Sequence, residues 1–250
     1  LGDVYKRQMP QIRFQRCFRF ISKRNRTLAV LFRTEQKGQF YIYIRKLQTD
    51  QLRYPDTGCI QKLQHRFVPK LLRTRSLHRI HHDKCGLERQ TYLGIFKQDN
   101  TWKDTWTEFY GECRLRDTMK MAVDAGKMNP EACAMLERLI TRLPELCPPQ
   151  TAFSLLHGDP WIGNLLYNGH ELVLVDCSIY YGNREIDLTT VDFFCPISPV
   201  FFDAYKEAYP LDPGYEERRD LWKINQWLGH VTLYGEKYMG TLMDAVKKYL

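Results

Sequence analysis

The stretch Leu156–Asn164, LHGDPWIGN, places an aspartate and an asparagine five residues apart in a short polar segment. Apolar runs flank it, with Phe153–Leu156 before it and Leu165–Tyr167 and Leu172–Val175 after it, each typical of a short strand. Asn168-Gly169 separates the last two runs, and this dipeptide favours a β-hairpin turn. The sequence therefore predicts a small hairpin with polar residues at its open end.

The length of the hairpin loop decides which residues face each other. With residues 168–171 as a four-residue loop, Asn164 faces Val175, and Asp176 follows at the open end. A tight two-residue turn would move the pairing by two residues and separate these polar groups. The longer loop gathers Asp159, Asn164 and Asp176, and one amide oxygen with two carboxylates makes a set of hard ligands suited to Mg²⁺.

Phosphoryl transfer needs the two functions that such a site provides. A metal ion neutralises charge on the phosphate oxygens, and a carboxylate accepts the proton of the attacking hydroxyl. The pattern His157-x-Asp159-x4-Asn164 has the Asp-to-Asn spacing of a kinase catalytic loop, and Asp176 stands where the metal-binding aspartate follows it. The alternative is a chance match in a surface loop. The acid at the matching hairpin end and YYGNREIDL at residues 180–188 favour the kinase interpretation.

Charge is unevenly distributed along the 250 residues, although the net charge is +8. Residues 1–84 hold 20 Lys/Arg against 5 Asp/Glu, whereas residues 85–250 hold 17 against 24. We interpret residues 1–74 as a basic segment of separate origin, either disordered or an out-of-frame reading, in which only the neighbourhood of Lys37-Gly38 predicts a hairpin. Residues 75–250 are predicted to form a folded, kinase-like lobe.

A nucleic-acid-binding protein is the alternative from another class, because aromatic side chains alternate with arginines in IRFQRCFRFISKR, residues 12–24. No nucleic-acid-binding fold is recognisable around that segment, so we expect no nucleic-acid partner. Binding to DNA or RNA that falls steeply with salt would support the alternative.

Compartment and redox state follow from composition. No apolar run reaches the length of a membrane span and the first residues lack a secretory signal pattern, which predicts a cytoplasmic protein without a membrane partner. The eight cysteines show neither a C-x-x-C motif nor zinc-ligand spacing, so we expect reduced thiols that are mainly buried.

The remainder of 75–250 is predicted to be mainly helical. Trp102–Ala125 carries apolar residues at helical spacing, and Asn129-Pro130-Glu131 has the N-cap, proline and acid typical of a helix start. We predict that Pro144 and the prolines after it end this second helix, and that Leu221–Tyr234 presents another apolar helical face. The expected fold class is α+β, a mainly helical domain around a small β element.

Four longer segments together resemble one family. They are LHRIHHDKCGLERQTYLG (77–94), NTWKDTWTEFYGECRLR (100–116), LLHGDPWIGNLLY (155–167) and VLVDCSIYYGNREIDL (173–188). From about Leu77 to its end the chain resembles the fructosamine kinase (ketosamine 3-kinase) family. The resemblance implies the aminoglycoside phosphotransferase fold, which is protein-kinase-like, with a mainly helical C-terminal lobe and a small β-hairpin catalytic element. It also implies ATP-dependent phosphorylation of a sugar hydroxyl on a ketosamine, meaning a glycated amine or protein, with ATP and Mg²⁺ as cofactors.

The resemblance implies a role for each residue of the site. Asp159 would be the catalytic base, and Asn164 and Asp176 would hold Mg²⁺ between the phosphates of ATP. Asp187 would brace the catalytic loop by hydrogen bonds, with a helix N-terminal acid as the compatible alternative. Trp161 would contact or shape the sugar site, or serve the structure alone.

Departures from the family pattern leave alternatives open. Cys177-Ser178 follows the metal-binding aspartate where the family has a proline and a small residue. An N-terminal lobe with a phosphate loop, a nucleotide lysine and an adenine-binding hinge is missing or not recognisable in residues 1–74, where Lys46 is the one candidate lysine or else a solvated basic residue. The alternatives to a ketosamine kinase are therefore another aminoglycoside- or choline-type phosphotransferase and a catalytically inactive truncated kinase.

Overall fold

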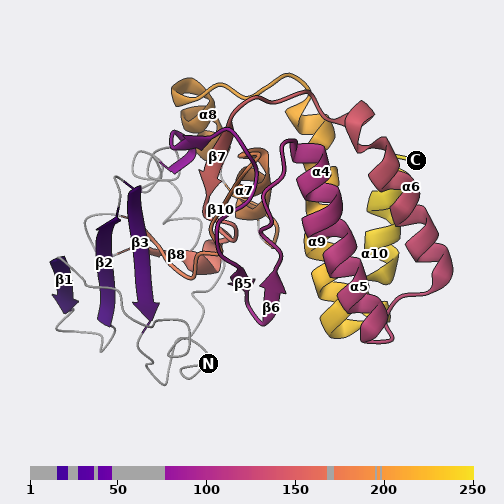
Figure 1. Ribbon diagram of the computed structural model, residues 1–250, viewed down its shortest axis with the longest axis horizontal. Coiled ribbons are helices and arrows are strands. Elements are labelled where there is room, and N and C mark those ends of the chain that lie inside the picture. The colour runs from indigo at the N-terminus through magenta and orange to yellow at the C-terminus, as the bar shows by residue number, and fades with distance from the viewer. Residues whose placement is uncertain are drawn as a thin grey trace. The chain divides into compact units, whose positions relative to one another are not determined.

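The computed structural model describes residues 16–21, 28–36, 39–46, 77–167, 172–194, 196–197 and 199–250 (Figure 1). The chain divides into two compact units, Leu1–Pro55 and Asp56–Leu250.

The first unit contains a three-stranded antiparallel sheet in the order β1-β2-β3. Its strands are β1 (Arg16–Ile21), β2 (Leu28–Gln36) and β3 (Gln39–Lys46). Gln36 pairs with Gln39, which leaves two residues between the strands and confirms the predicted hairpin. Lys46, the candidate nucleotide lysine, is the last residue of β3. The other predictions for residues 1–74 lie outside the described residues.

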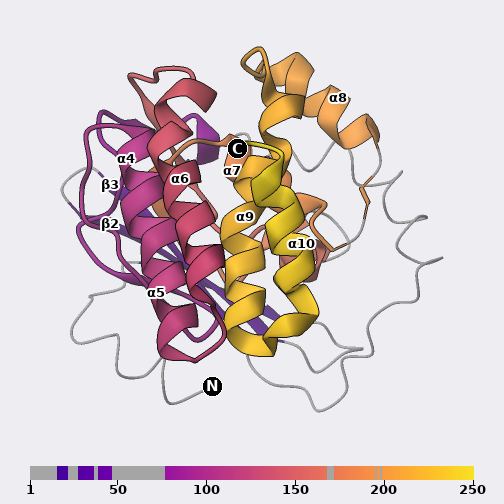
Figure 2. The same ribbon diagram turned by 90° about the vertical axis from the view of Figure 1, so that its right-hand side faces the viewer.

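Helices make up most of the second unit. They are α4 (Trp106–Tyr110), the π-helical turn η2 (Gly111–Arg116), α5 (Asp117–Asp124), α6 (Pro130–Leu146), α7 (Glu185–Val191), α8 (Pro199–Ala208), α9 (Tyr215–Tyr234) and α10 (Glu236–Lys247). The consecutive helices α4, η2 and α5 lie side by side with α6, α9 and α10 (Figure 2). The predicted mainly helical α+β organisation is confirmed for this unit.

The first of these helices begins later than predicted. Thr105 caps α4, because its side chain accepts a hydrogen bond from Glu108 N at 3.2 Å. Upstream of the cap, Lys103 pairs with Cys85 through two backbone hydrogen bonds of 2.9 Å each. The predicted start at Trp102 was therefore wrong. The helical spacing of the side chains gives no sign that the backbone of Lys103 pairs with Cys85.

Asn129 starts α6 as predicted, with its side chain accepting a hydrogen bond from a backbone N–H of the first turn. Pro144 does not end the helix, contrary to the prediction: it lies inside the last turn, and α6 continues to Leu146. A proline there removes a single backbone donor. The turn is still closed after it, because Cys147 N donates to Leu143 O at 3.0 Å.

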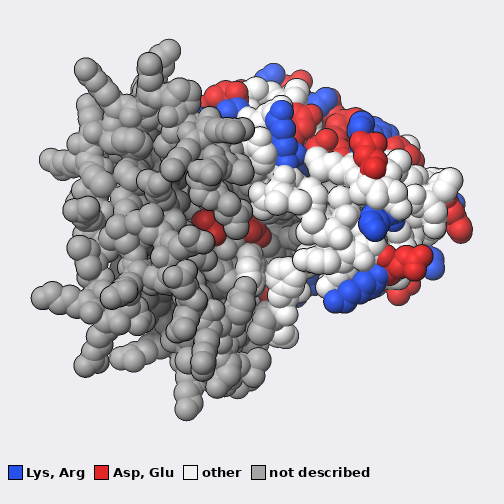
Figure 3. All heavy atoms as spheres, turned by 90° about the horizontal axis from the view of Figure 1, so that it is seen from below, with Lys and Arg blue, Asp and Glu red and all other residues white. Residues whose placement is uncertain are grey.

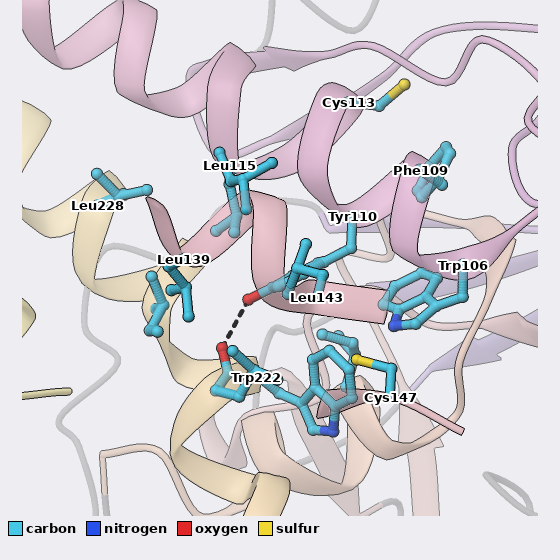
Figure 4. Packing of buried hydrophobic residues seen from close by; sticks show 14 of the residues in the cluster. Trp106, Phe109, Tyr110, Cys113, Leu115, Leu139, Leu143, Cys147, Trp222 and Leu228 are labelled. Carbon is cyan, nitrogen blue, oxygen red and sulfur yellow. Dashed lines mark hydrogen bonds between the residues drawn. The ribbon is translucent and has the colours of Figure 1, made fainter. Parts of the chain in front are cut away.

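A core of aromatic and aliphatic side chains joins the helices (Figure 4). Trp106 stacks on Tyr110 with 5.4 Å between ring centroids, and Trp222 of α9 meets Tyr110 edge-on at 5.2 Å. The Tyr110 hydroxyl donates to the Leu221 carbonyl oxygen at 2.8 Å, so the buried phenol keeps a hydrogen bond. Full burial of one large apolar side chain contributes about 1.5–3 kcal/mol. The core therefore holds α4 against α9.

Short strands carry the polar stretch on which the sequence argument rests. The strand β7 (Phe153–Leu156) is the centre of an antiparallel sheet, with β10 (Tyr180–Gly182) on one side and β4 (His81–His82) on the other. Two hairpins complete the unit: β5 (Thr91–Leu93) with β6 (Phe96–Gln98), and β8 (Leu165–Tyr167) with β9 (Leu172–Leu174). The predictions of β7, β8 and β9 are confirmed. The other strands have only two or three residues, too few for an alternating pattern to show.

Five cysteines lie in the part of the second unit that the structure describes, and all five are free thiols. Three of them, Cys85, Cys113 and Cys147, are buried, which confirms the predicted burial for these residues. No helix among the described residues has the length and apolar character that crossing a membrane requires.

Charged side chains of both signs lie along the described part of the face in Figure 3, with an uncharged band between them. The described part of this face carries no continuous basic patch of the kind that binds nucleic acid.

Candidate active site

The hairpin β8-β9 has the register that the longer loop predicts. Tyr167 pairs with Leu172, which leaves four residues between the strands. One step beyond the strands, Val175 N donates to the Asn164 carbonyl oxygen at 2.9 Å. Asp176 therefore follows directly beside Asn164, at the open end of the hairpin.

The backbone at Asp176 is itself unusual. Its φ is 54°, and it is the one non-glycine residue with a positive φ among those the structure describes. An L-residue other than glycine is disfavoured in this left-handed region, although aspartate tolerates it better than most. Such conformations gather at functional sites, where the surrounding structure holds them in place.

The loop after β7 is hydrogen-bonded to the segment between the hairpin and β10. Ser178 N donates to the His157 carbonyl oxygen at 2.8 Å. The next residue, Gly158, has φ of +84°, and a Cβ added to it would lie 2.1 Å from the Ser178 carbonyl oxygen. Only glycine allows this close backbone approach.

Replacing Gly158 by alanine is expected to destabilise the fold by about 2 kcal/mol or more, since the clash with Ser178 adds to the cost of the left-handed backbone. Gly126→Ala is the matched control: its φ is +67°, but an added Cβ would meet no atom within 4 Å. Urea denaturation of both variants measures the difference. Equal losses of stability in the two would contradict the proposed close packing of the loop.

Asp159 is held by the amide of Asn164. Asn164 Nδ2 donates to Asp159 Oδ2 and to the Asp159 carbonyl oxygen, both at 2.8 Å. Burial raises the pKa of Asp159 to about 7; the hydrogen bond from Asn164 opposes this, and the charges of Asp187 and Asp176 add to it. A carboxyl group with a pKa near neutrality can both take up and release a proton at physiological pH.

The oxygen atoms near the hairpin end fit a magnesium ion. Both hydrogen bonds of the Asn164 side chain use Nδ2, so Oδ1 is the atom with which this residue can ligate a cation. Asp176 is exposed and offers a carboxylate. No group of three or more His, Cys, Asp or Glu side chains able to hold a metal occurs among the described residues. Two protein ligands suffice for Mg²⁺, which usually keeps water molecules and substrate phosphates as its other ligands.

Asp187 lies in the first turn of α7 and is fully buried. Its Oδ2 accepts a hydrogen bond from His157 N at 2.7 Å, and its Oδ1 accepts one from Gly158 N at 2.9 Å. A third group, His78 Nε2, lies 3.1 Å from Oδ2. The carboxylate thus holds two consecutive backbone N–H groups of the loop that carries Asp159.

His157 is part of this loop, whereas His78 lies behind it and contacts Asp187. The buried His157 ring accepts a hydrogen bond from Asp159 N at 3.3 Å through Nδ1, and burial lowers the pKa of His157. Sequence reasoning missed His78. Its segment contributed to the family resemblance, but a single histidine 109 residues from its aspartate partner has no local signal of its contact.

Trp161 lies beside the loop and is partly exposed. Its ring packs over Gly163, where an added Cβ would come within 2.1 Å of it, and it meets the ring of Phe194 edge-on at 5.2 Å between centroids. Phe194 is 56% exposed and contacts the His230 ring of α9 at 5.4 Å. Sequence reasoning missed Phe194, and the adjacent phenylalanines Phe193 and Phe194 between two predicted helical regions were the signal that could have found it.

Comparison with solved structures identifies the class of fold. A candidate fructosamine-3-kinase from Thermobifida fusca YX-ER1 superposes with a TM-score of 0.67, covering 94% of this chain and 93% of that chain at 24% sequence identity. The fold is therefore protein-kinase-like. A family model described as fructosamine kinase matches residues 61–250. The chain belongs to the fructosamine kinase family.

Curated relatives agree with this assignment. The "probable ketoamine kinase" of Vibrio cholerae is 31% identical over 176 residues, covering 70% of this chain and 60% of the relative. The chloroplastic protein-ribulosamine 3-kinase of Arabidopsis thaliana is 34% identical over 170 residues, covering 66% of this chain and 51% of the relative. The ketosamine-3-kinase of Mus musculus is 30% identical over 166 residues, covering 66% and 53%. The chain thus spans between half and two thirds of the length of the curated relatives it matches.

Proposed function

We propose that this chain forms the catalytic lobe of a kinase that transfers the γ-phosphate of ATP to a sugar hydroxyl of a ketosamine. The observation that supports this most strongly is the pairing of Asp159 with Asn164 on a half-buried loop, beside Asp176 at the hairpin end. This arrangement brings a proton acceptor together with two oxygen ligands for a metal. The names of the curated relatives support the substrate class, a glycated amine or protein.

Asp159 acts as the base in this proposal. Its Oδ2 is occupied by the amide of Asn164, which leaves Oδ1 to accept the proton of the attacking hydroxyl. The carboxylate is oriented before the substrate arrives, because Asn164 holds its side chain and Asp187 holds the backbone N–H groups of His157 and Gly158 just before it. Orientation of this kind contributes much of the rate enhancement in phosphoryl transfer.

Asn164 Oδ1 and the Asp176 carboxylate would hold Mg²⁺ against the phosphates of ATP. When bound, the ion neutralises charge on the phosphate oxygens. The protein itself supplies the positioning: the hydrogen bond from Val175 N to Asn164 O sets the two ligands side by side.

Trp161 and Phe194 would form the wall against which the ketosamine lies. A ketosamine joins a sugar to a secondary amine that is protonated at neutral pH, and the face of an aromatic ring attracts such a cation. The partly exposed ring of Trp161 and the exposed ring of Phe194 offer those faces next to the catalytic loop.

The proposal is tested by incubating the purified chain with ATP, Mg²⁺ and fructosyl-lysine and measuring ADP release together with phosphorylated product by mass spectrometry. We expect product that requires both the ketosamine and Mg²⁺, and that disappears with EDTA. An aminoglycoside and choline serve as parallel acceptors, since phosphorylation of either in preference to fructosyl-lysine would replace the ketosamine proposal. Absence of product with every acceptor would show a catalytically inactive lobe.

A further inference from the structure

A buried chain of hydrogen bonds leads from α8 to the carboxylate that holds the catalytic loop. Arg184 NH1 donates to the Tyr205 hydroxyl oxygen at 3.2 Å, and that hydroxyl lies 2.8 Å from His78 Nδ1. The other ring nitrogen, His78 Nε2, lies 3.1 Å from Asp187 Oδ2. His78 and Asp187 are completely shielded from solvent, and Tyr205 is 3% exposed. Because these groups are buried, a water molecule cannot replace a hydrogen-bond partner that a substitution removes.

The chemistry of the groups determines which atom donates in each of these bonds. A carboxylate only accepts hydrogen bonds, so the bond to Asp187 requires a proton on His78 Nε2. In a neutral imidazole Nδ1 is then an acceptor, and the Tyr205 hydroxyl must donate to it. The phenol is able to do so, because Arg184 occupies its oxygen as a donor and burial raises the pKa of Tyr205 to about 12.

The backbone of His78 is anchored independently of its ring. The Ser154 hydroxyl, in β7, donates to the His78 carbonyl oxygen at 2.8 Å. Since Ser154 precedes the catalytic loop by only a few residues, the ring of His78 is held at a constant distance from that loop. What remains adjustable is the orientation of the ring, and Tyr205 is the group that contacts Nδ1.

We propose that Tyr205 and His78 are positioning residues for the catalytic loop. The Tyr205 hydroxyl donates to His78 Nδ1 and orients the ring so that Nε2–H meets Asp187, and Asp187 in turn holds the backbone N–H groups of His157 and Gly158. The expected loss of catalytic rate rests on the function proposed above. The expected loosening of the loop does not depend on that function.

The structure contains a matched control for this proposal. Tyr209, one turn after Tyr205, lies with its hydroxyl 3.0 Å from His81 Nε2, at the exposed end of the same region. Both tyrosines lose one hydrogen bond to a histidine when replaced by phenylalanine, and both keep their rings. Tyr205→Phe also removes the acceptor of one Arg184 bond, but Arg184 keeps its bonds to the carbonyl oxygens of Tyr209 and Pro210. Only Tyr205 contacts a histidine that is hydrogen-bonded to Asp187.

The test compares Tyr205→Phe with Tyr209→Phe in the full chain. We expect amide hydrogen exchange at His157 and Gly158 to be about tenfold faster in Tyr205→Phe, the effect of weakening one buried hydrogen bond, and unchanged in Tyr209→Phe. Nitrogen-15 spectra of the labelled histidines report the hydrogen bonds of the ring directly: we expect His78 to be protonated at Nε2 in both chains, with the Nδ1 signal shifted toward that of a nitrogen without a hydrogen bond in Tyr205→Phe. Neither measurement depends on kinase activity, so an inactive parent chain would refute the proposed function without deciding this inference.

With activity present, Tyr205→Phe is expected to lower kcat about tenfold with little change in KM, because loop orientation and not substrate binding is altered. His78→Gln provides a second variant, since it removes the Nδ1 atom that Tyr205 contacts while its amide N–H can still donate to Asp187. In that background Tyr205→Phe should have no further effect on loop exchange. The proposal is overturned if the two phenylalanine variants behave alike, if the Nδ1 signal of His78 is unchanged in Tyr205→Phe, or if Tyr205→Phe acts equally strongly with glutamine at position 78.

Discussion

Replacing Asp159 by asparagine is expected to lower kcat about 10³-fold, with the dissociation constant of ATP nearly unchanged. A positioned base contributes about 10²–10⁴-fold to the rate of a proton-transfer step. Asparagine keeps the shape of the side chain, and its amide oxygen still accepts the hydrogen bond that Asn164 Nδ2 donates. What is lost is the ability to take the hydroxyl proton, so the measurement is initial rates of ADP release at saturating ATP and fructosyl-lysine.

The stability of the same variant separates loss of chemistry from loss of fold. Because burial raises the folded-state pKa of Asp159 to about 7, folding favours the protonated acid, and ionisation costs stability as the pH rises from about 4 toward 7. Asp159→Asn removes that cost. In the metal-free chain the variant is therefore expected to gain stability relative to the parent over this pH range, by urea denaturation.

Asp244→Asn is the control for a change of charge, since Asp244 is exposed on α10. We expect its kcat to equal that of the parent chain. An Asp159→Asn variant that retains more than about a tenth of the activity would rule out Asp159 as the base.

The largest effect on stability is expected from Arg218→Met, with a loss of about 3–5 kcal/mol in the free energy of unfolding. Arg218 of α9 donates from NH2 to Glu185 Oε1 at 2.6 Å and from Nε to Glu185 Oε2 at 3.0 Å. Trp222 Nε1 donates to the same Oε2 at 2.7 Å. Methionine fills much of the volume but leaves the carboxylate of Glu185, 1% exposed, without its cation.

This ion pair also positions the candidate site. Glu185 stands in the first turn of α7 together with Asp187, so the bond from Arg218 ties the start of that helix to α9. Any shift of α7 moves the carboxylate that holds His157 N and Gly158 N. We therefore expect the Arg218→Met variant to lose loop protection in hydrogen exchange as well as stability.

Two further variants make this prediction decisive. Lys206→Met breaks the exposed pair with Glu216, 3.4 Å apart, and is expected to cost no more than about 1 kcal/mol. Glu185→Gln combined with Arg218→Met should be more stable than Arg218→Met alone, because the double variant leaves no unpaired buried charge. The ion pair would be unimportant if Arg218→Met cost less than about 1 kcal/mol, or if the double variant were no more stable.

Local signals in the sequence predicted a large part of the fold and of the site. The apolar runs around Asn168-Gly169 predicted the hairpin, and a four-residue loop predicted the pairing of Asn164 with Val175. The N-cap at Asn129 predicted the start of α6. In each case the interacting groups are at most a few turns or one hairpin apart, so their geometry follows from spacing along the chain.

Predictions failed where a distant partner competed with a local preference. Helical spacing extended the first helix to Trp102, but the backbone at Lys103 is paired with Cys85. One prediction failed for a local reason instead: Pro144, grouped with Pro148 and Pro149 as the end of α6, lies inside the last turn, where a proline removes only one backbone donor. The short strands β4 and β10 exist only because β7 lies between them, and neither has an alternating pattern of its own.

The sequence by itself determined the residue types of the candidate site, their order, and the hairpin that sets Asn164 beside Asp176. The resemblance also implied that Asp187 braces the catalytic loop. Only the tertiary structure decided what lies behind that carboxylate: His78 from the start of the lobe and Tyr205 from α8. The physical reason is that a buried polar group must find its partners wherever the packed core brings them, and that choice has no local pattern along the chain.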